Sequence, residues 1–358
     1  MTHSCGHNAQ GAALLGIAAA LKEEGALDGL CGTIRLMAVP AEEMIQLSYR
    51  EELRKKGLIR YMGGKVEFMA RGYFDDVDIA MMVHAANSGD DVDFACGVSN
   101  NGCIAKTIRF KGKSSHAGGA PHLGVNAQYA AMLGLQACND LRETLQEKDT
   151  IRFHPIMLGA TCAVNIIPDE MKIESFVRGK TMEAMKRENK KFNRALTGAA
   201  LAMGAGVELS DRPGYSPEYH DPDFMKLVEQ CCKDLVGEER VSFNYTQHGT
   251  GSSDFGDLTM VMPGVQWNSG GACGTAHGID YYVADAERMC LNSAKSQLFV
   301  AGALLENEAA AAKEIIANYK PEFPSIQAYF DAVNELILDK DAVIYGEDGD
   351  VRIDYLNR

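Results

Sequence analysis

The chain has 358 residues, of which 46% are hydrophobic and 23% charged, and its formal net charge at pH 7 is −14. This length predicts more than one domain, and the composition is typical of a globular protein with a sizeable core. The acidic balance argues against sequence-independent binding to nucleic acid or to an anionic membrane, because both need a basic face. No apolar run reaches the ~18 residues that span a bilayer. Ten scattered cysteines without paired spacing, and no secretory signal peptide, predict reduced thiols and a cytoplasmic protein.

The first part of the chain alternates between helical and strand patterns. Residues 9–24 predict a largely buried helix, and residues 33–39 and 76–84 predict buried strands. A helix followed by a short apolar strand is the repeating unit of an α/β sheet. Because sites in such sheets lie at the carboxyl ends of the strands, the polar residues that follow these strands are functional candidates.

The pattern changes after residue 102. The next elements form the order strand, helix, strand, strand, helix, strand, which is typical of a small ferredoxin-like α+β domain. These elements are expected at residues 103–110, 126–145, 156–164, 171–177, 181–203 and 207–210. After Gly214 the α/β character returns, so the small domain is predicted to be an insertion. Elements of the returning part are expected at residues 221–235 (helix), 260–262 (strand) and 285–307 (helix).

Residues of metal-ligand type gather at the predicted strand ends and loops. Cys5 and His7 alternate in the chain, so both can face one pocket, and a thiolate with an imidazole suits zinc. Each candidate alone has an ordinary structural explanation, such as a helix start or a satisfied histidine. Together they offer enough ligands for two divalent ions, with Glu42 as an adjacent general base. The proposed ligands are Cys5, His7, Glu43, His84 and His277.

Six short motifs occur in the order of a known family. The sequence resembles the metal-dependent amidohydrolases related to aminoacylase, hippurate hydrolase and bacterial carboxypeptidases, over roughly residues 1–305. The Cys-Gly-His-Asn form, with residues 63–66 and 74–78, is most similar to the p-aminobenzoyl-glutamate hydrolase branch. The motifs are His3-Ser4-Cys5-Gly6-His7-Asn8, Pro40-Ala41-Glu42-Glu43, Met82-Val83-His84, Ser115-His116-Ala117-Gly118, Asn165-Ile166-Ile167-Pro168 and Ala276-His277-Gly278.

The resemblance implies a two-domain architecture. Residues 1–102 and 215–318 would form an α/β catalytic domain with a zinc-peptidase-like mixed sheet flanked by helices. Residues 103–214 would form an inserted α+β ferredoxin-like lid domain that makes a homodimer through a sheet edge and one helix. Residues 319–358 would be a carboxy-terminal extension. Family members carry a long segment before the Cys-Gly-His motif, so we expect the amino-terminal part of the catalytic domain to be absent from this chain.

The resemblance also implies roles for single residues. The five ligands named above match the family's metal ligands, and Glu42 matches its general base. His116 matches a residue that reaches into the active site of a partner copy and holds the developing oxyanion. Asn165 and Arg178 match positions that bind the substrate's carbonyl or carboxylate. His3 is not expected to be a ligand. Two divalent ions, zinc or manganese, are expected, and only Cys5 favours zinc.

The activity that the resemblance implies is hydrolysis of an amide bond. The expected small-molecule substrates are N-acyl or N-aroyl amino acids, or dipeptide-like compounds such as p-aminobenzoyl-glutamate, attacked by a metal-activated water. A carboxypeptidase or dipeptidase is the alternative enzyme. The alternative from another class is a non-catalytic or truncated subunit that pairs with another chain.

Overall fold

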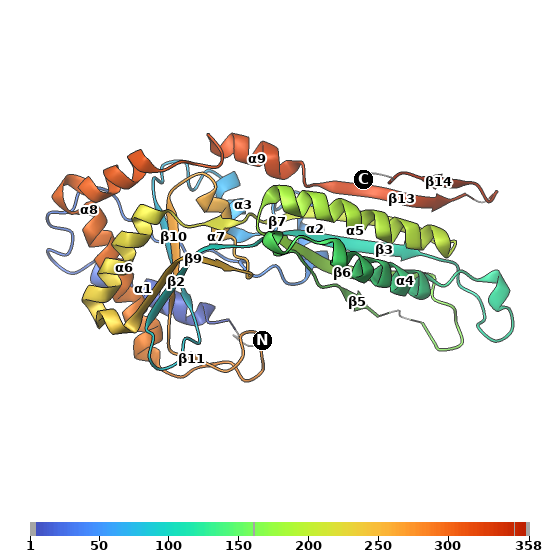
Figure 1. The fold of residues 1–358 in the computed structure, drawn as a ribbon, viewed down its shortest axis with the longest axis horizontal. Coiled ribbons are helices and arrows are strands. Elements are labelled where there is room, and N and C mark those ends of the chain that lie inside the picture. Colours follow the sequence, from blue (N-terminus) through green and yellow to red (C-terminus); the bar gives the residue numbers. More distant parts are fainter. Residues whose placement is uncertain (1–4, 160–161, 347, 356–358) are drawn as a thin grey trace.

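The computed structural model describes residues 5–159, 162–346 and 348–355. The molecule is elongated, with a helix-flanked sheet at one end and a long antiparallel sheet at the other (Figure 1). The order of strands is β1-β10-β2-β8 in the first sheet, with β9 also paired to β2. It is β14-β13-β7-β3-β6-β4 in the second sheet, with β5 also paired to β6.

The first sheet mixes parallel and antiparallel pairs. β1 runs parallel to β10 and β2 parallel to β9, whereas β10 and β8 are antiparallel to β2. Two helices cover it and bury a common core in which Trp267, Phe224 and Val300 are inaccessible to solvent. The elements are β1 (Ala80–Ala85), β2 (Phe94–Asn100), β8 (Glu218–Tyr219), β9 (Val241–Gly249), β10 (Gly264–Ser269), α6 (Pro222–Val236) and α8 (Ser293–Asn318).

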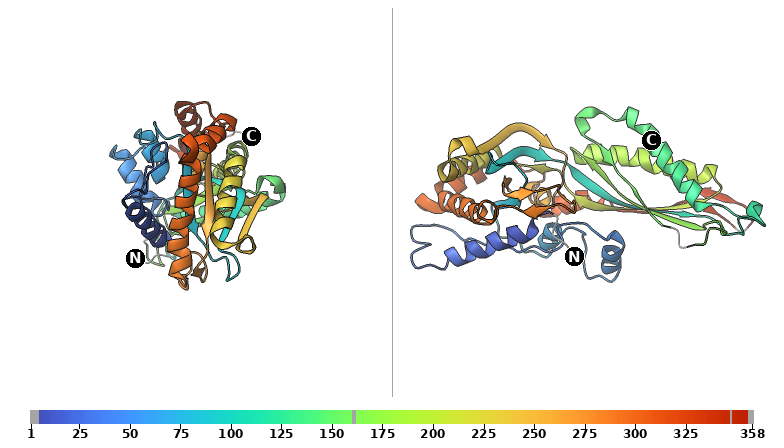
Figure 2. Two further views of the ribbon diagram at one scale, coloured as in Figure 1. Left: turned by 90° about the vertical axis from the view of Figure 1, so that its left-hand side faces the viewer. Right: turned by 90° about the horizontal axis from the view of Figure 1, so that it is seen from below.

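Helix α1 (His7–Ala20) lies against α8 and β1 (Figure 2). Its first residue, His7, is therefore close to His84 near the carboxyl end of β1. A π-helical turn, Glu287–Asn292, leads into α8, and the short pair β11 (Ala272–Cys273) and β12 (Tyr282–Val283) flanks the loop with His277. Among the helices of the described residues, none is long and apolar enough to cross a membrane.

The second sheet is antiparallel throughout, and its strands alternate between a helix-covered face and an opposite face. Asn126 and Thr181 cap the two covering helices, since each side chain accepts a hydrogen bond from the backbone of the first turn. The elements are β3 (Gly102–Lys111), α4 (Ala127–Asp140), β4 (Arg152–Phe153), β5 (Ile156–Leu158), β6 (Glu170–Gly179), α5 (Met182–Ala202), β7 (Gly206–Tyr215), β13 (Leu338–Tyr345) and β14 (Val351–Ile353).

Short helices lie where the two sheets meet. Leu47 of α2 and Met62 pack with Ala105 on the face of the second sheet that α4 and α5 leave open. Helices α3, α7 and α9 share another core, in which Tyr329 of α9 is buried. These helices are α2 (Leu47–Lys55), α3 (Gly64–Ala70), α7 (Phe255–Thr259) and α9 (Ile326–Asn334).

Two predicted strands are wrong. Residues 33–39 belong to no sheet and are largely exposed. Their apolar pattern suits a strand, but a strand also needs a hydrogen-bonding neighbour, and no described segment pairs with this one. Residues 260–262 form the turn after α7, and the strand begins at Gly264, after Pro263. Met260 and Met262 pack in the same core as α9. A short apolar run does not distinguish a buried turn of this kind from a strand.

Other boundaries shift. The strand expected at 207–210 continues to Tyr215 because it pairs with β3 along its whole length. Of the strand expected at 156–164, the structure has β5, and residues 160–161 lie outside the described residues. Strands β2, β9 and β13 lie where no strand is predicted. The carboxy-terminal extension is part of the fold, since β13 adds to β7 at one edge of the second sheet.

Candidate metal centre

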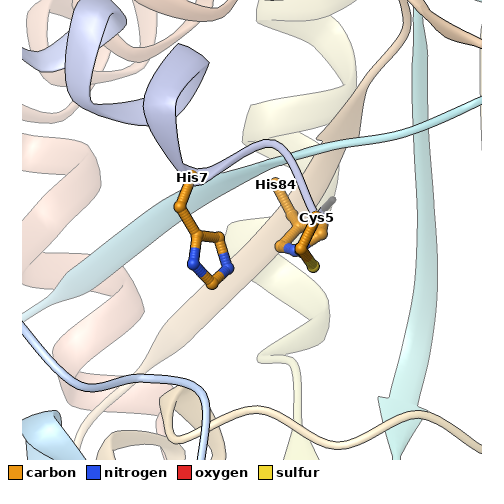
Figure 3. A group of neighbouring side chains, drawn as sticks. All are labelled: Cys5, His7 and His84. Carbon is orange, nitrogen blue, oxygen red and sulfur yellow. The ribbon is translucent and has the colours of Figure 1, made fainter. Parts of the chain in front are cut away.

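A tight turn places Cys5 and His7 at the carboxyl end of β1. Gly6 between them has φ 92°, and a Cβ there would lie 2.4 Å from Cβ of Ala85. Glycine therefore allows both the left-handed backbone and the close approach. The sulfur of Cys5 lies 3.5 Å from Nε2 of His84 (Figure 3).

His84 is held in the tautomer that a metal site needs. Its Nδ1 lies 2.7 Å from the carbonyl oxygen of Ala85, which can only accept a hydrogen bond. Nδ1 therefore carries the proton, and the lone pair of Nε2 faces Cys5. The ring of His7 stands perpendicular to the ring of His84, with centroids 5.9 Å apart (Figure 3).

The loop between residues 40 and 46 supplies the carboxylates. Glu42 Oε2 lies 3.4 Å from Nε2 of His7, and Glu43 Oε1 lies 3.3 Å from Nε2 of His277. Three overlapping groups have all their potential ligand atoms within 4.8 Å of one another. They are Cys5 with His7 and His84, Cys5 with Glu43 and His277, and His7 with Glu42 and Glu43. Cys5, His7 and Glu43 each belong to two groups, so the donors can serve two neighbouring ions.

The electrostatics of the cluster fit a bound cation. Burial, and then the charge of Glu43, raise the pKa of the Cys5 thiol to about 12. Burial lowers the pKa of both His7 and His84, so these imidazoles are neutral and able to donate a lone pair at pH 7. Neutral imidazoles, carboxylates and a thiolate, which Cys5 would become on binding a divalent ion, are the donors that zinc and its neighbours take. The residues present therefore fit a divalent metal.

Two predicted site residues lie far from this cluster in the same chain. His116 is exposed in the loop that follows β3. This loop lies at the end of the second sheet that is farther from the first sheet (Figure 1). Nδ1 of His116 accepts hydrogen bonds from the amides of Gly118 and Gly119, at 3.2 and 2.9 Å. Asn165 lies beside it, because its carbonyl accepts a 2.8 Å hydrogen bond from the amide of Ala117. The structure thus groups these two residues with each other and not with the ligands.

Arg178 is at the opposite end of the second sheet, near the junction. Its guanidinium donates to Oγ of Ser252 at 2.9 Å and to Nε2 of His154 at 3.2 Å. It also lies over the ring of Phe176, 5.5 Å from the ring centroid. Ser252 belongs to the loop before α7, so Arg178 joins the second sheet to the first part of the fold. His3 lies outside the described residues.

Residues 1–295 match the peptidase family M20/M25/M40. The chain belongs to this family. It is 30% identical over 269 residues to a mouse Xaa-Arg dipeptidase, covering 74% of this chain and 56% of that protein. It is 25% identical over 295 residues to a Haemophilus influenzae homolog of a p-aminobenzoyl-glutamate hydrolase component, covering 80% of this chain and 60% of that protein. The chain therefore spans 56 to 60% of the length of these relatives.

A solved structure supports the same fold. A dinuclear metal-binding peptidase of the M20 family from Bacillus subtilis superposes with a TM-score of 0.59 at 20% identity, covering 85% of this chain and 73% of that one. The mixed sheet with flanking helices is thus the M20 peptidase fold.

Lys65 and Asp254 form a buried ion pair beside the cluster of this M20 chain, and this contact is not predicted from the sequence. Nζ of Lys65 donates to Oδ1 of Asp254, and the amide of Lys65 donates to Oδ2 at 2.9 Å. Asp254 is fully buried, and its charge contributes to the pKa of Glu42, which burial raises to about 7. In the sequence, residues 63–66 are part of the family resemblance, and residues 251–254 resemble a family loop that is expected near the substrate. No local spacing indicates that these two segments meet.

Proposed function

We propose that this chain is a metal-dependent hydrolase of the M20 family that cleaves the amide bond of N-acyl or N-aroyl amino acids or of dipeptide-like compounds. The observation that carries the proposal is the ligand cluster. Cys5, His7, Glu43, His84 and His277 form overlapping groups of potential ligands, and Glu42 lies beside His7 and Glu43. The activities after which the relatives are named support the substrate class. A p-aminobenzoyl-glutamate-like amide is the first candidate, and the mouse relative favours a dipeptide as the second.

The residues of the cluster and Arg178 have separate roles in the proposed reaction. Two divalent ions, zinc or manganese, would polarise the scissile carbonyl and acidify a water. Glu42 takes the proton of the attacking water and passes it to the leaving amine. Arg178, with its planar guanidinium, binds the substrate's carboxylate from the second sheet.

The order of β3, α4, β4 with β5, β6, α5 and β7 supports assigning residues 103–214 to an inserted ferredoxin-like domain. On this assignment, residues 1–102 and 215–318 make up the catalytic domain, and residues 319–358 the extension. The helix and the sheet edge that would form a homodimer carry exposed apolar side chains. On α4 these are Tyr129, Met132 and Leu133, and on β5 they are Ile156 and Met157. Such a patch is typical of an interface.

A homodimer gives His116 and Asn165 a role. They lie at the far end of the second sheet, so within one chain they cannot serve the site that Glu42 occupies. We assign both residues to the site of the partner copy. There His116 stabilises the oxyanion that develops on the substrate, and Asn165 binds the substrate's carbonyl.

Metal content tests the proposal directly. The parent protein is purified, loaded with zinc or manganese, and analysed for bound metal beside Cys5→Ala and His84→Ala. We expect about two metals per chain in the parent. Both variants should bind fewer, because each removes a ligand from a site that two ions share. A parent without bound metal would overturn the assignment. Hydrolysis of p-aminobenzoyl-glutamate and of Xaa-Arg dipeptides then decides between the two substrate classes.

A further inference from the structure

The loop that carries Glu42 and Glu43 has no regular secondary structure to stabilise its conformation. Residues 40–46 form neither helix nor strand. Ala41 has φ 62° and Gln46 has φ 55°, which are left-handed conformations that residues with a Cβ rarely adopt. Such a loop keeps one conformation only if groups outside it hold it there.

Arg50 supplies the first set of those groups. It lies on α2 and is 7% exposed. Its guanidinium donates to the carbonyl oxygens of Ala41 at 3.0 Å, of Ile45 at 3.3 Å and of Glu43. It also donates to the carbonyl of Met62, which ties the loop to the next segment of the chain. A planar fork of five N–H donors can serve several carbonyls at once, which an ammonium group cannot do in the same geometry.

Tyr215 supplies the second set. Its hydroxyl donates to the carbonyl of Glu42 and accepts a 3.1 Å hydrogen bond from the amide of Met44. Tyr215 is the last residue of β7 and is buried. The loop is therefore joined to the second sheet as well as to α2.

Together the two side chains bind every residue from 41 to 45 through its backbone. Arg50 bonds to the carbonyls of residues 41, 43 and 45, whereas Tyr215 bonds to the carbonyl of residue 42 and the amide of residue 44. None of these bonds uses the side chain of Glu42 or Glu43. Both carboxylates are thus left to face the imidazoles of the cluster, His7 for Glu42 and His277 for Glu43.

We infer that Arg50 and Tyr215 are positioning residues that aim Glu42 and Glu43 at the metal centre. The inference rests on the proposed function for the identity of that centre. It also means that a displacement of β7 is transmitted to the general base, because the hydroxyl of Tyr215 bonds to the backbone of Glu42 itself and of Met44.

The first experiment measures Co²⁺ affinity by competition with a chelator, followed by the absorption of the cobalt–thiolate bond to Cys5. Variants are Tyr215→Phe, Arg50→Met and Arg50→Lys. Loss of a group that orients a ligand typically weakens metal binding by about 10- to 100-fold. We expect this loss in Tyr215→Phe and Arg50→Met, and a smaller one in Arg50→Lys. Tyr219→Phe is the matched control, since that hydroxyl donates to the carbonyl of Lys180 at 2.9 Å, away from the loop.

The second experiment needs no metal. Hydrogen–deuterium exchange of the metal-free full chain should speed up at residues 41–46 in Tyr215→Phe, because the amide of Met44 loses its acceptor, and should stay unchanged there in Tyr219→Phe. Unchanged exchange at residues 41–46 together with parental Co²⁺ affinity in Tyr215→Phe would overturn the inference. Failure of the metal assignment has a different signature. In that case Glu43→Ala would bind Co²⁺ as tightly as the parent. The exchange rates at residues 41–46 would still test whether Arg50 and Tyr215 hold the loop.

Discussion

Glu42 lies between a neutral imidazole and a buried carboxylate, and these neighbours define its chemistry. Nε2 of His7 is 3.4 Å from its Oε2, and burial together with the charge of Asp254 raises its pKa to about 7. A carboxylate of raised pKa accepts a proton more readily than an exposed one. Glu42 is not needed to complete the ligand set, since two groups of potential ligands form without it. They are Cys5 with His7 and His84, and Cys5 with Glu43 and His277.

Glu42→Gln should therefore separate turnover from metal binding. General-base catalysis contributes roughly 10²- to 10⁴-fold to a rate, so we expect kcat to fall by about that factor. Metal content per chain should stay at the parental value. Steady-state hydrolysis and elemental analysis of the same samples check both parts, and Glu52→Gln on the exposed side of α2 is the control. Full activity in Glu42→Gln would remove the general base from the mechanism.

Gly6 and Gly11 offer a matched pair of substitutions at the start of the chain. Gly6→Ala places a Cβ 2.4 Å from Ala85 at a positive φ, so the turn between Cys5 and His7 must move and metal affinity should fall. Gly11→Ala, within α1, meets no atom within 4 Å. It should leave metal binding unchanged and stabilise the helix by up to about 1 kcal/mol. Chelator competition and thermal unfolding measure the two effects; equal metal affinity in both variants would contradict this role of the turn.

At the scale of elements, α9 fastens the carboxy-terminal segment to the junction of the sheets. The hydroxyl of Tyr329 donates to Oδ1 of Asp257 at 2.7 Å and lies 3.0 Å from Oγ of Ser216. Burial raises the pKa of Asp257 to about 7. Since Ser216 directly follows β7, this contact ties α9 and α7 to the base of the second sheet.

The raised pKa of Asp257 predicts how the free energy of unfolding changes with pH. An acid whose folded pKa lies above its unfolded value binds its proton more tightly in the folded state. Its contribution is therefore most favourable below the unfolded pKa of 3.8, weakens as pH rises toward 7, and is constant above that. The side chain in Asp257→Asn does not titrate. The free energy of unfolding of this variant, relative to that of the parent, should therefore increase as the pH rises from about 4 to about 7. Denaturant unfolding at several pH values tests it; parallel curves for the two proteins would show that Asp257 does not titrate in this range.

At the scale of the whole molecule, β13 and β14 occupy one edge of the second sheet and leave the β5 edge for association. β13 pairs with β7 from Leu338 to Val343. The open edge carries the exposed Ile156, and α4 carries further exposed apolar side chains. On the proposed homodimer, a second copy that docks there brings its His116 toward the cluster of the first.

Mixing two inactive variants tests this arrangement. Glu42→Gln and His116→Ala should each be nearly inactive alone. In a mixed dimer, the His116→Ala chain keeps Glu42 and receives the intact His116 of its partner, so one of the two sites is complete. An equal mixture that exchanges chains should recover about a quarter of parental activity, because half of the dimers of a two-fold assembly are then mixed. Light scattering of the mixture checks the dimer, and no recovery from exchanged dimers would place His116 outside the site.

Much of the candidate site could be predicted from local sequence. The alternation of Cys5 and His7, and the carboxylates that directly follow an apolar run, are features of adjacent residues. The helices and several strands of residues 103–214 follow from hydrophobic periodicity. The resemblance added substrate-binding roles for Asn165 and Arg178, and a place for His116 in the site of another copy. These predictions needed no knowledge of which segments meet.

The tertiary structure alone decided the rest, because it depends on segments distant in sequence. Residues 33–39 have the pattern of a strand but no described neighbour, whereas β13 becomes a strand because β7 lies beside it. No local pattern indicates the contacts that Arg50, Tyr215, Lys65 and Asp254 make at the site. These contacts form only when α2, α3, β7 and the loop before α7 pack together. Spacing along the chain determines which residues can share a face, whereas packing determines which faces meet.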